Sequence, residues 1–274
     1  MCVCGWTFNQ TKSSGKPLEV VRFLGLNIDS RDLSFNIPDD NLWEIRKKLG
    51  KLKNLGYHQV HVKQLAKVVG TLQSLRLVTG PLIAVMTRSL YRTIATADSW
   101  NSYVSMDVRS QNKVTWWYEH IRSLNKYTIN TSRSATPVSF EVASDASGIG
   151  HFCYVMKEDD KSMLAARAFT EEERKESSTL RELTAFRDTW TNPEVLAKFA
   201  GTGIVHYMDN QAMVQVIAKG SRNKCLQPLI VKTVLALRNH GIKMMVVWKS
   251  RDDKIINFAE AGSCDFHADD ISME

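Results

Sequence analysis

The chain has 274 residues, 43% of them hydrophobic and 24% charged, and these ordinary values exclude a disordered or fibrous protein. It contains no run of about eighteen apolar residues, and its first residues lack the apolar core of a signal peptide, so we expect neither membrane insertion nor secretion. Lysine and arginine exceed aspartate and glutamate by 36 to 29, and the net charge of +7 suits a polyanionic partner without identifying one.

The five cysteines indicate the compartment of the protein. Their odd number and the lack of a CxxC pair favour reduced thiols in the cytoplasm or nucleus over disulfides or a structural zinc site. The length is comfortable for two domains, so the organisation of the chain comes before its motifs.

The first forty residues have the pattern of strands. LEVVRFLGLNIDSRDLSFNI holds two apolar runs, Val20–Ile28 and Leu33–Ile37, and the polar turn DSRD between them predicts a β-hairpin. Pro38 ends the hairpin, and a helix capped by Asp39 or Asp40 follows. We therefore assign residues 1–38 to a hairpin unit. The next helix has an apolar face formed by Leu42, Ile45, Leu49 and Leu52.

Residues 39–130 have helical periodicity and predict a small bundle of three or four helices. A break at Gly80-Pro81 separates the second and third of them, and residues 125–137 indicate a linker. The aromatic residues of TWWYEHI could stack on bases, but the helical spacing of Trp117, Ile121 and Leu124 favours the core of the bundle. The apolar positions of the second helix are Val62, Leu65, Val69, Leu72 and Leu75.

Residues 137–274 have a different character. Strands are expected in VSFEVASDASGIGHFCYVMK, SMLAARAFT, GIVHYMDN and KMMVVWKS, with a helix over Glu171–Trp190, two helical stretches in residues 210–239, and a short closing helix. The predicted fold class is α/β: a mixed five-stranded sheet with helices, preceded by a β-hairpin and a small helical bundle.

Four acids stand out by their positions in this last segment. Asp145 and Asp209 each end an apolar strand, Glu182 lies in the long helix, and Glu260 lies in the closing helix. Carboxylates that converge at strand ends repel one another unless cations lie between them, which is typical of sites for Mg²⁺ or Mn²⁺. Two such ions can activate a water and stabilise the leaving oxygen of a phosphodiester. Taken singly, each acid has an alternative as a turn former or a solvated helix residue.

The order of these acids carries a resemblance. SDASGIGHFCYV, SSTLRELTAF and YMDNQAMVQVI resemble the signatures of the type-1 ribonuclease H domain of retroelements, with Asp145, Glu182 and Asp209 at the metal-binding positions. RFLGLNIDSRDLSFNIP resembles the hairpin that ends the palm of a reverse transcriptase. LAKVVGTLQSL and GPLIAVMTRSL resemble the thumb and connection of DIRS-like retrotransposon polyproteins.

The resemblance implies a two-metal enzyme that cuts the RNA strand of RNA–DNA hybrids, as part of a larger reverse transcriptase polyprotein. In the retroelement pattern the fourth metal-binding acid is an aspartate in A-D-x-x-S, and Glu260 stands at that position in this chain. One expectation is therefore weakened activity. Asp265 is an alternative candidate for the fourth ligand. The polymerase motif aromatic-x-Asp-Asp is missing before the hairpin, so we expect no template copying by this chain. Asp269 and Asp270 are expected at the surface.

Basic residues are expected to follow the phosphates of the hybrid. Lys219, Arg222 and Lys224 lie in the loop after the Asp209 helix, and Arg251 belongs to the W-x-x-R element that the resemblance places before the fourth acid. For the loop, the alternative is an ordinary solvated face. A second group, in the first helix of the bundle, consists of Arg46, Lys47, Lys48, Lys51 and Lys53, and a solvated helix face is equally expected for it.

The histidines and the competing functions complete the predictions. His151, His206 and His240 receive no role, and His267 could shuttle a proton. The leading hypothesis is hydrolysis by an RNase H domain. The alternatives are a catalytically weakened or inactive nucleic-acid-binding remnant of a retroelement, and a related nuclease acting on DNA.

Overall fold

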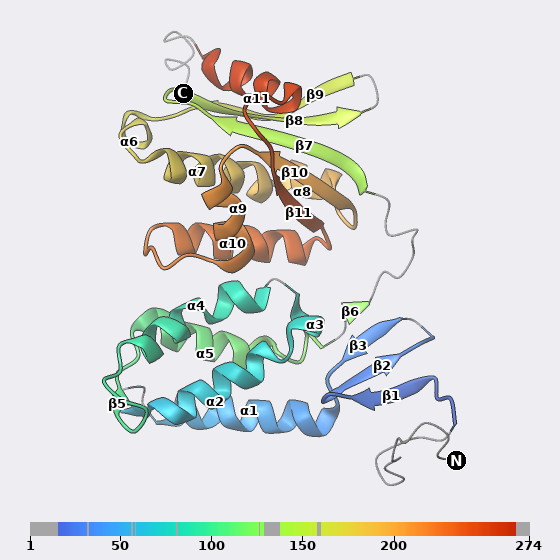
Figure 1. Cartoon of the computed structure of the whole chain (residues 1–274), viewed down its shortest axis with the longest axis vertical. Helices are drawn as coiled ribbons and strands as arrows, with labels where there is room; N and C mark the ends of the chain where they lie inside the picture. Colours follow the sequence, from blue (N-terminus) through green and yellow to red (C-terminus); the bar gives the residue numbers. More distant parts are fainter. Residues whose placement is uncertain are drawn as a thin grey trace, which may run out of the picture.

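The computed structural model describes residues 16–266, except for residues 32, 56, 58, 81, 126, 129–137 and 158–159. A small sheet and a group of helices lie on one side of the molecule, and a larger sheet with its own helices lies on the other (Figure 1). Within these described ranges no helix is both long and apolar enough to cross a membrane. His267, Asp269 and Asp270 lie outside the described residues, as does most of the predicted linker.

The first sheet is antiparallel and has the order β1-β2-β3-β6. The apolar run Val20–Ile28 was wrongly predicted as one strand, because a two-residue turn at Leu24 and Gly25 divides it. Both residues have positive φ, 49° and 82°, which is the conformation that a tight hairpin turn requires. The turn DSRD therefore joins the second and third strands. The four strands are β1 (Val20–Phe23), β2 (Leu26–Asp29), β3 (Ser34–Asn36) and β6 (Tyr127–Thr128).

The helices of the first half bury the apolar positions expected from their spacing, and Trp117 lies in their core. One cap was predicted wrongly, because Pro38 is the N-cap of the first helix and Asp39 and Asp40 lie inside its first turn. There, their negative charges interact favourably with the positive end of the helix dipole. The elements are α1 (Asp39–Asn54), β4 (Val60–His61), α2 (Val62–Gln73), α3 (Arg76–Thr79), α4 (Leu82–Ala95), β5 (Tyr103–Val104) and α5 (Val108–His120).

The second sheet has five strands in the order β11-β10-β7-β8-β9. The central strands β7 and β10 and the edge strand β11 run parallel, while β8 is antiparallel to its neighbours β7 and β9. Almost every residue of β10 is buried, as expected for a parallel strand covered on both faces. The strands are β7 (Val138–Ala146), β8 (Gly150–Lys157), β9 (Asp160–Ala168), β10 (Gly203–Met208) and β11 (Lys243–Trp248).

Helices cover both faces of this sheet: α11 lies on one face and α7 on the other (Figure 1). The helix predicted over Glu171–Trp190 is in fact two, because Ser177 accepts a hydrogen bond from the Leu180 backbone N–H and caps a new helix. The fold class predicted from the sequence is confirmed. The helices are α6 (Glu171–Arg174), α7 (Ser178–Thr191), α8 (Pro193–Lys198), α9 (Gln211–Lys219), α10 (Leu226–Asn239) and α11 (Lys254–Cys264).

The two halves share a packed interface in which α4 lies against α9 and α10. Val85 of α4 is fully buried in the core of the second half, and Val234 of α10 packs against both cores. Polar contacts join the same elements: Arg238 donates to the Thr79 carbonyl at 3.0 Å, and Gln227 donates to the Val85 carbonyl at 2.7 Å. The two halves are therefore continuous through α10.

Candidate active site

The four candidate acids come from four elements that meet at one edge of the second sheet. β7 and β10 are neighbouring parallel strands, so their carboxyl ends lie side by side, with Asp145 near the end of one and Asp209 directly after the other. Glu182 lies on α7, beneath the sheet, and Glu260 lies on α11, above it. The sequence therefore places two acids through strand ends and two through helices that cover opposite faces.

Asp145 is held by the helix above the sheet. The Ser263 hydroxyl, which is fully buried, donates a hydrogen bond of 2.6 Å to Asp145 Oδ2. Burial raises the pKa of the Asp145 carboxyl above its ordinary value, and the negative charges of Asp209 and Glu260 raise it further, while the bond from Ser263 opposes them. Asp145 thus lies within the electrostatic reach of two of the other candidate acids.

Glu182 responds to the same group of charges from the opposite face. Burial, together with the charges of Asp209 and Asp145, raises the pKa of the Glu182 carboxyl to about 7. Asn210 opposes this shift by donating from its side-chain amide to Glu182 Oε1 at 2.9 Å. Asn210 also caps α9 through its side-chain oxygen, so one residue begins that helix and orients the acid.

Asp209 is almost buried, its side chain being 6% exposed, and it has a cationic partner. The Arg251 Nε donates to Asp209 Oδ2 at 2.6 Å, although the Arg251 side chain is itself 72% exposed. Trp248 donates from its indole N–H to the Asp209 carbonyl at 2.8 Å, which joins the end of β11 to the end of β10. Both conspicuous residues of the W-x-x-R element therefore contact Asp209.

A close approach of α11 to β8 sets the position of Glu260. A Cβ atom at Gly262 would lie 2.5 Å from the Phe152 ring, so only glycine lets the helix come this near to the sheet. Asp265, the alternative fourth ligand, is the C-cap of α11 and is exposed. The charge of Glu260 acts on Asp145, where it raises the carboxyl pKa.

The donor set suits a hard divalent cation, because all four side chains are carboxylates. As the side chains stand, however, no group of three or more His, Cys, Asp or Glu residues in the described ranges could hold a metal ion. Three of the carboxylates instead accept hydrogen bonds from Ser263, Asn210 and Arg251. The Arg251 guanidinium contacts the Asp209 oxygen that a metal ion would also need. The four side chains therefore have the right chemistry for the ion, but they would have to move to hold it.

The predicted basic residues divide into two places. Arg251 lies at the acids, whereas Lys219, Arg222 and Lys224 lie at the far end of α9, about 13 Å along the helix from its start. All three side chains are exposed. The loop they form is fastened to the helices of the first half, since Arg109 of α5 donates to the Lys224 carbonyl at 3.0 Å.

Two histidines that receive no role from the sequence are buried in the structure. His206 lies in the apolar run of β10 and is fully buried, so its polarity within that run was the available signal. His151 is 2% exposed, and neither ring nitrogen has a hydrogen-bond partner among the described residues. Burial lowers the pKa of the His151 imidazole to about 4, which keeps it neutral.

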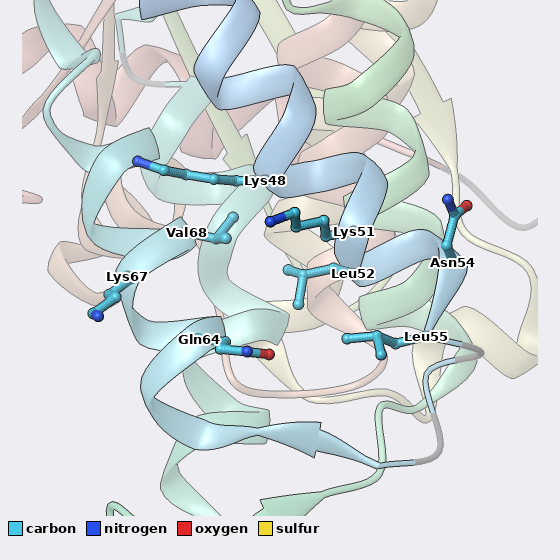
Figure 2. A pocket seen from close by; sticks show the side chains of 8 residues that line it. All are labelled: Lys48, Lys51, Leu52, Asn54, Leu55, Gln64, Lys67 and Val68. Atoms are coloured by element: carbon cyan, nitrogen blue, oxygen red, sulfur yellow. The ribbon is translucent and has the colours of Figure 1, made fainter.

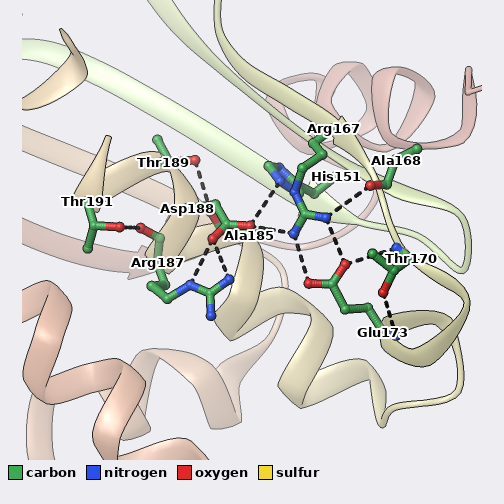
Figure 3. A network of polar contacts seen from close by, with 10 residues as sticks. All are labelled: His151, Arg167, Ala168, Thr170, Glu173, Ala185, Arg187, Asp188, Thr189 and Thr191. Atoms are coloured by element: carbon green, nitrogen blue, oxygen red, sulfur yellow. Dashed lines mark hydrogen bonds and ion pairs between the residues drawn. The ribbon is translucent and has the colours of Figure 1, made fainter. Parts of the chain in front are cut away.

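A polar network surrounds His151 on the α7 side of the sheet (Figure 3). Arg167 of β9 pairs with Glu173 of α6 at 2.7 Å and with Asp188 of α7 at 2.6 Å, while His151 Nε2 lies 3.8 Å from Asp188. Glu173 also completes a capping box with Thr170 at the start of α6. The network fastens α6 and α7 to the sheet and thereby fixes the helix that carries Glu182.

The sequence and the structure were each compared with known proteins. No protein-family model matches the chain, and a comparison with curated proteins gives no match. Among solved structures, the similar chains include foamy viral protease-reverse transcriptases and RNase H1 proteins.

The particular structures are distant. The foamy viral protease-reverse transcriptase in complex with RNA/DNA hybrid is 14% identical, with 87% of this chain and 30% of that chain covered and a TM-score of 0.33. The foamy viral protease-reverse transcriptase dRH in complex with double-stranded DNA is 14% identical, with 83% of this chain and 38% of that chain covered and a TM-score of 0.33. RNase H1 from Halobacterium salinarum NRC-1 is 14% identical over 45% of this chain and 92% of that one, with a TM-score of 0.35. The chain thus spans well under half of the foamy virus proteins.

Proposed function

We propose that the chain is an endoribonuclease H that hydrolyses the RNA strand of RNA–DNA hybrids with two Mg²⁺ or Mn²⁺ ions. In this proposal it is the C-terminal part of a retroelement reverse transcriptase of the DIRS type, works inside the cell in the cytoplasm or nucleus, and acts alongside the remainder of that polyprotein. Residues 1–38 end the palm, residues 39–130 form the thumb and connection, and residues 137–274 form the nuclease.

One observation carries the proposal: acids from two parallel strand ends and two helices lie within electrostatic reach of one another at one edge of the sheet. Burial and neighbouring carboxylates raise the pKa values of Asp145 and Glu182, so both acids lie in a region that is short of positive charge. A protein has no structural use for such mutual repulsion, and a bound cation relieves it. Perturbed carboxyl groups gathered at strand ends are therefore typical of a functional site.

The metal ions would be held by Asp145, Glu182, Asp209 and Glu260. Bound divalent ions would supply an activated water and charge stabilisation for the leaving oxygen of a phosphodiester. The chain itself orients the ligands: Ser263 holds Asp145 and Asn210 holds Glu182. Glu260 retains the charge of the expected aspartate and adds one methylene, which changes the reach of that ligand.

Arg251 has two roles in the proposal. Without ions its guanidinium offsets the charge of Asp209, at 2.6 Å. Because its side chain is 72% exposed on a loop, it is free to leave Asp209 and contact a phosphate of the hybrid once a cation replaces it. The exchange keeps the buried Asp209 carboxylate neutralised at each stage.

The five basic residues of α1 fall into three groups. Arg46 and Lys53 lie over the ring of Tyr118 at 4.8 and 5.4 Å, and Lys47 lies over the ring of Trp43 at 4.4 Å, so these three contact aromatic rings of the first half. Lys48 and Lys51 instead line a cavity of about 520 Å³ between α1 and α2 (Figure 2). Lys67 of α2 and the apolar side chains of Leu52, Leu55 and Val68 complete its wall.

We assign phosphate contacts in the first half to these cavity lysines, and contacts near the junction of the halves to Lys219, Arg222 and Lys224. These basic residues, together with Arg251, give the sequence-independent attraction that a hybrid-binding protein needs. Recognition of the hybrid would then rest on the shape of the duplex and on the 2′-hydroxyl groups of its RNA strand.

The test is cleavage of a labelled RNA–DNA hybrid in Mg²⁺ and in Mn²⁺, with duplex DNA of the same sequence as the second substrate. Asp145→Asn and Asp209→Asn should abolish cleavage while leaving the circular dichroism spectrum unchanged. Asp252→Asn is the matched control, because Asp252 is exposed and follows Arg251 directly. Cleavage of the DNA duplex at a similar rate would instead favour a DNA nuclease. If the unaltered protein cleaves the hybrid in neither metal, the proposal that it is an enzyme is wrong.

A second candidate function is binding without cleavage, as in a weakened or inactive remnant of a retroelement. Two observations favour it: Glu260 replaces the expected aspartate, and the carboxylates as they stand leave no arrangement for a metal ion among the described residues. This candidate predicts that the unaltered protein retards the hybrid in a gel but leaves its RNA strand intact, and that Asp145→Asn does not alter the retardation.

A further inference from the structure

A buried imidazole lies directly beneath the candidate site. His206 of β10 has no exposed surface, and its two ring nitrogens contact two different elements. Nε2 lies 2.8 Å from the hydroxyl of Ser144 in β7, and Nδ1 accepts a hydrogen bond of 3.0 Å from the indole N–H of Trp190 in α7. The ring of Phe186 in α7 also meets it edge to face, with centroids 5.2 Å apart.

These contacts determine which tautomer is present. The indole N–H of Trp190 can only donate, so Nδ1 of His206 must be unprotonated. The ring proton therefore lies on Nε2 and is donated to Ser144. A protonated imidazole would bring two donors face to face at Trp190, so the neutral form is the one that satisfies both partners.

Each element joined by His206 carries one of the acids. Ser144 immediately precedes Asp145, His206 lies three residues before Asp209, and Phe186 lies one helical turn after Glu182. Each of the three acids accepts a hydrogen bond from a separate donor: Ser263, Arg251 or Asn210. Backbone hydrogen bonds between β7 and β10 set the spacing of the strands that lead to Asp145 and Asp209, whereas α7, which carries Glu182, is a helix outside this ladder. The position of Glu182 relative to the two aspartates therefore depends on side-chain contacts between α7 and the strands.

We propose that His206 is a positioning residue: by tying α7 to β7 and β10, it sets the distances of Glu182 from Asp145 and Asp209. The inference rests on the proposed function for its kinetic consequence only. It assigns a role to a residue that touches neither substrate nor metal ion, and that acts through Ser144 and Trp190.

Three variants separate positioning from simple stability. His206→Leu removes both hydrogen bonds and leaves the Ser144 and Trp190 groups buried without partners. His206→Gln is the conservative variant, because its amide can both accept from Trp190 and donate to Ser144. Phe199→Leu is the matched control: Phe199 is fully buried and packs against Trp190 with centroids 5.9 Å apart, but makes no polar link to the strands.

The first experiment measures the metal-free protein by carbon-13 NMR of its side-chain carboxyl groups. His206→Leu should shift the resonances of Asp145, Asp209 and Glu182, and Phe199→Leu should leave them in place. Nitrogen-15 shifts of the unaltered protein should show Nδ1 of His206 unprotonated and Nε2 protonated. Unshifted carboxyl resonances in His206→Leu would overturn the inference.

The second experiment measures hybrid cleavage at a temperature where all variants are folded. His206→Leu should lower kcat by about tenfold or more at unchanged KM, as loss of groups behind a metal site typically does. His206→Gln should recover most of kcat, and Phe199→Leu should keep it. An equal loss in His206→Leu and Phe199→Leu would refute positioning. Absence of cleavage in the unaltered protein, together with shifted carboxyl resonances in His206→Leu, would refute the nuclease and leave the positioning role standing.

Discussion

The contact between α11 and β8 allows a prediction that compares substitutions at two helical glycines, Gly262 and Gly70. A Cβ atom built at Gly262 lies 2.5 Å from Cγ and Cδ1 of Phe152, which are the inner atoms of the ring. The ring has little room to retreat, because it packs against Phe258 and Tyr154 with centroids 6.0 and 6.1 Å away. Gly70 in α2 is also a helical glycine, but a Cβ atom there meets nothing within 4 Å.

The two substitutions to alanine should have opposite signs. Gly70→Ala should stabilise the protein by about 0.5–1 kcal/mol, because alanine loses less backbone entropy in a helix. Gly262→Ala gains the same amount of helix stability and loses about 1–3 kcal/mol to overpacking, so it should be destabilising by up to about 2.5 kcal/mol. Because the helix propensity cancels, the difference between the variants measures the overpacking at Phe152.

Urea unfolding followed by circular dichroism gives the free energy of unfolding of each variant. Gly262→Ala should also lower hybrid cleavage, because the helix it displaces carries Glu260 and the Ser263 hydroxyl that holds Asp145. If Gly262→Ala proves as stable as Gly70→Ala, the close approach of α11 to the sheet does not exist in solution. The position of Glu260, which was inferred from that approach, would then be wrong.

Three further predictions concern the site and its support. Glu260→Asp should maintain or raise hybrid cleavage, and a collapse of activity would mean that Glu260 is not the fourth ligand. Arg251→Ala should weaken hybrid binding and lower the slope of log affinity against log salt by about one, if its guanidinium contacts one phosphate; an unchanged slope would exclude that contact. Burial lowers the pKa of His206 from 6.5 to about 3, so its contribution to stability is present above pH 6.5 and is lost as the pH falls toward 3. At pH 4.5 the loss from His206 is about 2.7 kcal/mol. Between pH 6.5 and 4.5, urea unfolding should therefore find that the unaltered protein and His240→Gln, which alters an exposed histidine, each lose about 2.7 kcal/mol more stability than His206→Gln does.

The sequence predicted most of the secondary structure, because helix faces and strand runs are local patterns. The apolar positions of α1 and α2 and the core position of Trp117 follow from helical spacing, and the structure confirms them. The errors lie where one or two residues interrupt a continuous pattern. Leu24-Gly25 turns the first strand back, and Ser177 caps a new helix within a stretch that was read as one.

The candidate site was predictable only in part. Strand ends gave Asp145 and Asp209, and the order of motifs gave Glu182 and Glu260, whose roles stay predictions. The partners of these acids were not foreseeable, because Ser263 meets Asp145 across 118 residues and Arg251 meets Asp209 across 42. Likewise, the sequence did not show where the loop after the Asp209 helix lies, whereas in the structure α9 carries Lys224 away from the acids to a contact with Arg109. Contacts between distant segments depend on packing that no local pattern encodes.

The helix α10 has one consequence for how this polypeptide can be divided. Its residues Val231, Val234 and Leu235 pack against the core of the first half, while its remaining apolar side chains belong to the second. A fragment that began at residue 137 would present this stripe to water and would be prone to self-association. The second half is therefore not a detachable module: fused to another protein, it would need new contacts to cover α10, and its solubility should depend on the helices that precede it.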